Sequence, residues 1–146
     1  MNEKRVRQVF DVAIPYLMHG ERIQLATVAS VGSVSLARKA AVATAVGIAS
    51  GGLMIANVKP RRMYIAVTEH SLLFFEGNTS SGRPGKKLLM RLEKQHLEAS
   101  EPKRGWLTLS AQLSILGQPK GLKITFPRPC REDGQYLLAG LGKRRY

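Results

Sequence analysis

Residues 63–76, which read MYIAVT-EHS-LLFFE, decide the fold of this chain. Two runs rich in β-branched and aromatic residues, 63–68 and 72–76, flank the polar residues Glu69, His70 and Ser71. Short apolar runs joined by a few polar residues are typical of a β-hairpin. We therefore expect two antiparallel strands here, joined by a tight turn.

The rest of the chain continues this pattern of short strands and turn signals. Residues 21–31 alternate well enough for an earlier strand. Later runs suited to strands lie at 88–92, 97–101, 106–113 and 122–126, with Pro- and Gly-containing turns at 102–105 and 117–121. Strands this short and evenly spaced are typical of a small antiparallel sandwich or barrel.

A helix is expected at each end of the chain. Asn2 is a suitable N-cap, and Val6, Phe10 and Ala13 recur on one face, which predicts a surface helix packed on the sheet. Leu137 and Leu138 predict a final helix over 130–142. The expected fold class is α+β, mainly β: an antiparallel barrel or sandwich of about seven strands with an N-terminal helix and a C-terminal capping helix.

Length and charge limit the kinds of partner. A chain of 146 residues is expected to form one domain. Its 23 basic residues outnumber 10 acidic ones, and the net charge of +13 predicts a polyanionic partner. Because only 6% of the residues are aromatic, base stacking has little support. The composition therefore favours anionic lipid or an acidic protein over nucleic acid.

The chain carries no recognisable catalytic or metal-binding motif. The histidines are far apart, and Cys130 has no base placed beside it by sequence. Residues 77–84 fail as a phosphate-binding loop, because Arg83 stands where lysine is needed and Pro84 where a hydroxyl is needed. We predict no enzyme activity, no cofactor and no metal site.

Trp106 follows the turn at 102–105, beside Lys103 and Arg104. Its large apolar side chain is expected to lie in the core, or half in it, at the start of a strand. The alternative is an exposed anchor next to two cations.

An uncharged stretch, 40–58, is the main compositional anomaly, because it consists mostly of Ala, Gly, Val, Ile and Ser. One interpretation is an insertion that packs on the barrel or forms a homo-oligomer through Ala43, Gly47 and Gly51, which recur every four residues. The others are a mobile hydrophobic loop, a hairpin touching a membrane and a membrane-spanning helix. A single crossing is impossible if the strands on both sides of the stretch pair in one sheet.

Two motifs resemble those of bacterial pleckstrin-homology-like domains. Residues 67–75, VTEHSLLFF, resemble the family's L-T-x-x-R-L-hydrophobic hairpin, with Ser71 in place of the usual arginine. Residues 20–23, GERI, resemble the G-E-x-hydrophobic lead into its first strand. The resemblance covers 20–34 and 60–142. It implies a barrel of the kind that takes lipid, phosphopeptide or protein ligands.

The resemblance divides a single domain, 1–146, into three parts. These are an N-terminal helix at 1–19, an Ala/Gly-rich insertion at 35–60 between the first two strands, and the barrel with its C-terminal helix at 61–142.

The resemblance also implies an anion-binding site. In family members that bind phosphoinositides, the loop between the first two strands supplies basic residues. The matching cations here are Lys39, Lys59, Arg61 and Arg62, with Arg38 beside them. We therefore predict a non-catalytic binding or scaffold module in the cytoplasm, acting on the inner face of the cell membrane or on an acidic protein. The alternatives are a nucleic-acid-binding accessory protein and a structural homo-oligomer.

Overall fold

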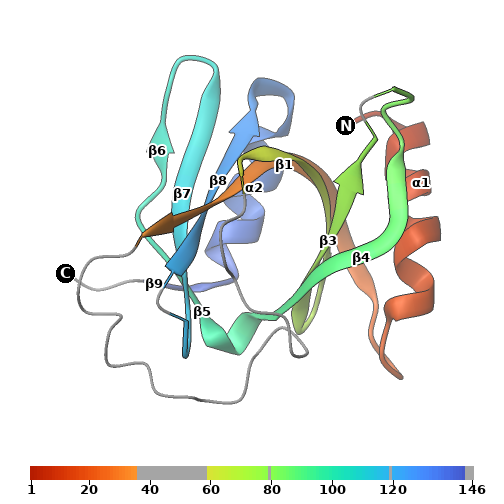
Figure 1. Ribbon diagram of the computed structural model, residues 1–146, viewed down its shortest axis with the longest axis horizontal. Helices are drawn as coiled ribbons and strands as arrows, with labels where there is room; N and C mark the ends of the chain where they lie inside the picture. The colour runs from red at the N-terminus through yellow and green to blue at the C-terminus, as the bar shows by residue number, and fades with distance from the viewer. Residues whose placement is uncertain (36–58, 79, 119, 144–146) are drawn as a thin grey trace.

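The computed structural model describes residues 1–35, 59–78, 80–118 and 120–143 (Figure 1). Two helices and nine strands follow one another in these described residues. They are α1 (Glu3–Ala13), β1 (Ile23–Ser35), β2 (Arg61–Thr68), β3 (Ser71–Gly77), β4 (Pro84–Glu93), β5 (Leu97–Ala99), β6 (Lys103–Arg104), β7 (Thr108–Ile115), β8 (Lys120–Pro127), α2 (Arg131–Ala139) and β9 (Gly142–Lys143). Short 3-10 turns occupy Ile14–Tyr16, Lys94–His96 and Arg128–Cys130.

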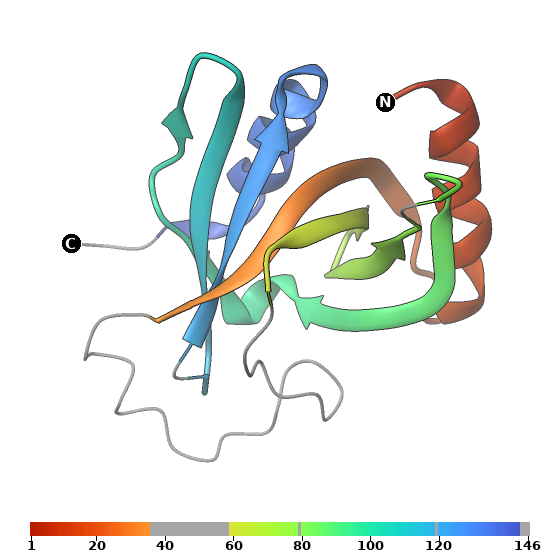
Figure 2. The same cartoon turned by 45° about the horizontal axis from the view of Figure 1, so that its top comes forward.

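The strands form one curved sheet in the order β4-β3-β2-β1-β8-β7-β5-β9, with β6 paired to β7 (Figures 1 and 2). The pairings are antiparallel except that of β5 with β9, which is parallel. The structure therefore confirms a mainly β fold with a helix near each end. The resemblance to pleckstrin-homology-like domains stays a prediction.

Helix α1 covers the outer face of one half of the sheet, made of β3, β4 and the adjoining parts of β1 and β2. Asn2 caps the helix as expected, because its side chain accepts a hydrogen bond from the Arg5 N–H at 2.8 Å. Val9 and Ala13 are fully buried, and the Tyr16 ring that follows lies 5.8 Å from the ring of Phe75. Because this half is covered outside by α1 and inside by the core, β2 and β3 are continuous apolar runs, not alternating ones.

Helix α2 closes the inner side of the sheet. Its Gly134 faces Phe126 so closely that a Cβ there would lie 2.5 Å from a ring carbon. In Figure 1 the helix lies behind β1, β8 and β7. Neither helix is drawn over the outer face of β7 and β8 in Figures 1 and 2. The sheet thus has a half covered by α1 and an open half, and the open half consists of β6, β7, β8 and the ends of β1 and β2 around Ser30 and Arg62.

Strands β1 and β2 pair with each other on either side of the uncharged stretch. Val31 is opposite Arg61, and Gly32 is so close to Pro60 that a Cβ on it would lie 2.8 Å from the Pro60 Cγ. Both flanks of residues 36–58 therefore belong to one sheet, while the stretch itself, for which a packed insertion, a membrane-touching hairpin and a membrane-spanning helix were predicted, lies outside the described residues. In the part of the chain that the structure describes, no helix has the length and apolar character to span a bilayer.

The strands near the C-terminus differ from the sequence-based prediction. Strand β7 begins at Thr108, not at 106, and β6 occupies residues that were expected to form only a turn. Strand β9 was not predicted. Two-residue strands such as β6 and β9 exist through their pairing with neighbours, so they leave no periodic pattern in the sequence.

Candidate functional site

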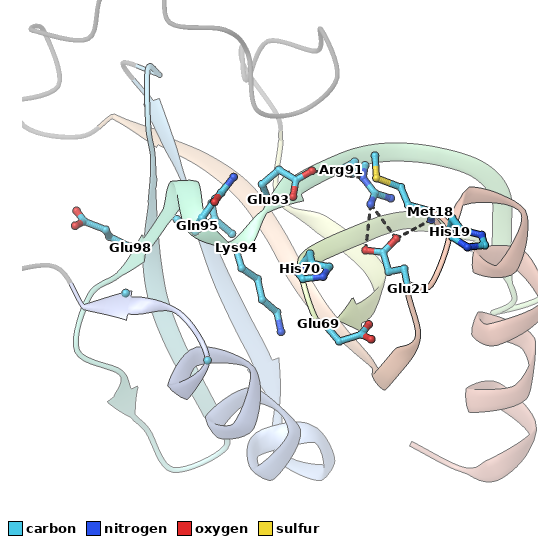
Figure 3. A pocket seen from close by; sticks show the side chains of 13 residues that line it. Met18, His19, Glu21, Glu69, His70, Arg91, Glu93, Lys94, Gln95 and Glu98 are labelled. Atoms are coloured by element: carbon cyan, nitrogen blue, oxygen red, sulfur yellow. Dashed lines mark hydrogen bonds and ion pairs between the residues drawn. The ribbon is translucent and has the colours of Figure 1, made fainter.

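A pocket of about 740 Å³ lies where the β2–β3 turn, the segment before β1 and the end of β4 meet (Figure 3). The carboxylate of Glu21 lies in it with only 2% of its side chain exposed. Both carboxylate oxygens accept hydrogen bonds from Arg91 Nη2, at 2.9 and 3.1 Å. The Met18 N–H and the Thr68 hydroxyl also donate to this carboxylate.

These contacts keep Glu21 ionised. Burial alone would raise its pKa, but the hydrogen bonds from Met18, Thr68 and Arg91, with the charge of Arg91, together lower the pKa to about 2. The pair also joins separate segments, because Arg91 Nη1 donates to the Tyr16 carbonyl at 3.1 Å. Since the carboxylate oxygens are occupied by these donors, the Glu21–Arg91 pair holds the fold together and does not present a free charge.

Thr68 connects this pair to the β2–β3 turn. Its Oγ1 accepts from the backbone N–H groups of His70 and Ser71, at 3.2 and 3.0 Å. The threonine side chain thus closes the tight turn between β2 and β3. The same hydroxyl donates to Glu21, so the two motifs of the predicted family resemblance meet at one point.

The rest of the pocket carries charges of both signs. Glu69 accepts the Arg22 N–H at 2.7 Å, a bond that lowers the pKa of its carboxyl. Burial lowers the pKa of Lys94, against the opposing charge of Glu69. Glu93 and Glu98 add further carboxylates (Figure 3). Among the described residues no group of three His, Cys, Asp or Glu is placed to hold a metal ion. This mixed pocket does not favour an anionic ligand.

The predicted anion-binding residues are only partly within the described chain. Arg38 and Lys39 lie outside it, as do the predicted contact residues Ala43, Gly47 and Gly51. Lys59, Arg61 and Arg62 are all exposed at the start of β2.

Strand geometry separates Arg61 from Arg62, because successive side chains point to opposite faces. Arg61 pairs with Glu76, with 3.2 Å between Nη1 and Oε1. Arg62 belongs to the outer face, on the open half of the sheet. Among the described residues of the predicted set, Arg61 and Arg62 thus lie on opposite faces of the sheet.

Strand pairing instead places Arg62 on the same face as cations from distant parts of the sequence. One row of paired residues crosses five strands of the open half: Arg62, Ser30, Thr125, Ser110 and Lys103. Lys123 lies in the next row, between Gly32 and Gln112. At ~4.8 Å between strands, the first row is about 19 Å long.

We call the described residues of these two rows the open face. Its cations are Arg62, Lys103 and Lys123, all exposed, and none of its residues is acidic. Hydroxyl side chains of Ser30, Thr125 and Ser110 lie between Arg62 and Lys103.

The β6–β7 hairpin ends in a strongly exposed apolar tip, which contradicts the prediction for Trp106. Arg104 pairs with Leu109, and the Gly105 N–H donates to the Thr108 carbonyl at 2.7 Å. Trp106 and Leu107 therefore form the two-residue loop, where no neighbouring strand covers them. Trp106 is 87% exposed and Leu107 is 54% exposed. The prediction of a core residue was wrong because the strand begins two residues later than expected.

Cations surround this tip. Lys103 and Arg104 form β6, and Arg131 Nη1 donates to the Gly105 carbonyl at 3.5 Å. Arg128 is exposed and follows Pro127, the register partner of Thr108. The tip and the open face share Lys103.

A comparison with protein-family models and with curated proteins finds no match to this chain. The function must therefore be argued from the surfaces described above.

Sequence reasoning found Arg62 but missed Lys103 and Lys123 as its companions. Their grouping depends on the register of four strand pairs, which no local pattern reveals. The pairing of Glu21 with Arg91 was missed for the same reason. The tip did have a local signal, since two cations and a glycine directly precede Trp106.

Proposed function

We propose that this protein is a non-catalytic module that binds the surface of an anionic phospholipid membrane through the open face. The observation that carries the proposal is the placement of Arg62, Lys103 and Lys123 on a sheet face that neither helix covers and that has no acidic residue in its two rows. Lipid phosphates accept hydrogen bonds from lysine, arginine and hydroxyl groups, and the face offers all of these.

Simple electrostatics gives the expected strength. Each lysine or arginine near an anionic leaflet contributes ~1 kcal/mol, so the three cations together stabilise the bound state by about 3 kcal/mol. The net charge of +13 adds long-range attraction. Binding of this kind is reversible and weakens with salt. Anionic lipids are concentrated in the cytoplasmic leaflet, so the proposal implies a peripheral protein at the inner face of the cell membrane.

Sedimentation with vesicles tests the proposal. The full chain is expected to sediment with phosphatidylserine-containing vesicles at low salt and not with phosphatidylcholine vesicles. The triple variant Arg62→Gln, Lys103→Gln, Lys123→Gln should weaken the partition by about 100-fold.

A matched control removes three charges elsewhere. Lys4→Gln, Arg7→Gln, Lys87→Gln changes exposed cations on and near α1 and has the same net charge. It should weaken binding by only a few-fold, through the long-range field. If both variants lose the same amount of vesicle binding, the open face is not the binding site. If the wild-type chain ignores anionic vesicles but binds duplex DNA or an acidic protein, the membrane is not the partner.

A further inference from the structure

We propose that the Trp106–Leu107 tip inserts into the interfacial layer of the bilayer, so that the protein is anchored by apolar contact as well as by charge. The inference rests on the proposed function, because it needs the same anionic membrane, but it assigns a different part of the surface to a different interaction.

Exposure is the first argument. Trp106 is the most exposed of the large apolar side chains in the described residues, at 87%, and its neighbour Leu107 is 54% exposed. Transfer of apolar surface out of water is favourable by roughly 25 cal/mol per Å². Tryptophan in particular partitions to the boundary between headgroups and acyl chains, where its ring is in an apolar environment and its N–H can still find an acceptor.

The side chains around the tip are mostly cationic, and this positive charge favours a bilayer with anionic headgroups. Lys103, Arg104, Arg128 and Arg131 surround the loop, against the two acids in the first turn of α2, Glu132 and Asp133. Four cations against two acids leave an excess of positive charge at the level where headgroup phosphates lie when the tip is inserted. An apolar tip with a basic collar matches the layered chemistry of an anionic membrane surface.

Rigidity is the third argument. The loop is closed by the bond from the Gly105 N–H to the Thr108 carbonyl, and the next residue, Leu109, is fixed in the core with 1% exposure. Figures 1 and 2 show the hairpin at the same end of the sheet as the last residues of β8, beside the start of α2. A tip held this way loses little conformational entropy when it binds.

The chain provides its own probe, because Trp106 is its single tryptophan. On addition of phosphatidylserine-containing vesicles to the full chain, we expect the tryptophan emission to shift to shorter wavelength. Acrylamide quenching should fall, and brominated acyl chains should quench the emission. None of these changes is expected with phosphatidylcholine vesicles at physiological salt.

A pair of leucine variants isolates the apolar contribution. Leu107→Ser should weaken sedimentation with anionic vesicles by about 5- to 10-fold, from the apolar area it removes. The matched control is Leu116→Ser on the β7–β8 turn, at the other end of β7, where the leucine is 53% exposed. This control should bind like wild type.

The outcomes separate the two proposals. If the chain sediments with anionic vesicles but Trp106 stays accessible to acrylamide and Leu107→Ser binds normally, insertion is wrong and the proposed function stands. If the chain does not sediment with anionic vesicles at all, both are wrong. Burial of Trp106 by an added soluble protein, with no response to vesicles, would identify the tip as a protein contact.

Discussion

A glutamate–arginine pair lies near each end of the β2–β3 hairpin, and the two pairs have different roles. At the turn end, Glu21 and Arg91 are 2% and 13% exposed and bind through two short contacts. At the opposite end of the hairpin, where β2 begins and β3 ends, Arg61 and Glu76 are 47% and 56% exposed and share one contact of 3.2 Å. Burial decides the difference: the first pair is committed to the fold, and the second can exchange its partner for an external anion.

The largest effect is expected from Arg91→Ala. This change leaves the Glu21 carboxylate buried without its cation, which should lower the free energy of unfolding by about 3–5 kcal/mol. Urea unfolding followed by circular dichroism measures it. The double variant Glu21→Gln, Arg91→Met removes both charges and should recover part of the loss. A loss below about 1 kcal/mol in Arg91→Ala would show that the turn-end pair does not hold the fold.

Acid should produce a smaller effect at the same end. The folded-state pKa of Glu21 is about 2, below its ordinary value of 4.5. The stabilisation from its ionised form is therefore fully present above pH 4.5 and is lost as the pH falls towards 2, on the order of 2–3 kcal/mol. Urea unfolding at several pH values measures this loss. The variant Glu21→Gln should show a flatter dependence across this window, and an unchanged profile would contradict the assignment to Glu21.

The smallest change in the free energy of unfolding is expected for the exposed pair of Arg61 and Glu76. Arg61→Ala removes an exposed ion pair, so the free energy of unfolding should fall by no more than about 1 kcal/mol, and by less at high salt. The same urea titration at two salt concentrations tests this. A loss as large as that of Arg91→Ala would mean that exposure does not distinguish the two pairs.

Local patterns predicted much of the fold. The apolar runs around Glu69-His70-Ser71 became β2 and β3, and the Asn2 cap and apolar stripe became α1. These features depend on residues close in sequence, so periodicity and capping reveal them. Strands β6 and β9 and the outer position of Trp106 depend on pairing with distant segments. For that reason the sequence did not predict them.

The candidate site was predicted less well than the fold. The sequence singled out Arg62 by its place next to the uncharged stretch, but Lys103 and Lys123 join it only through strand register. Alternation along β2 also moved Arg61 to the opposite face, beside Glu76. A run of cations in sequence becomes a patch only where the backbone turns their side chains the same way.

The close approach of Gly32 to Pro60 has a consequence for how this protein can change over evolutionary time. The chain enters β2 directly beside β1, because Val31 is opposite Arg61 and Gly32 lies against Pro60. A side chain at position 32 would collide with Pro60 and push the start of β2 away from β1, so position 32 is expected to stay glycine as the rest of the sequence drifts.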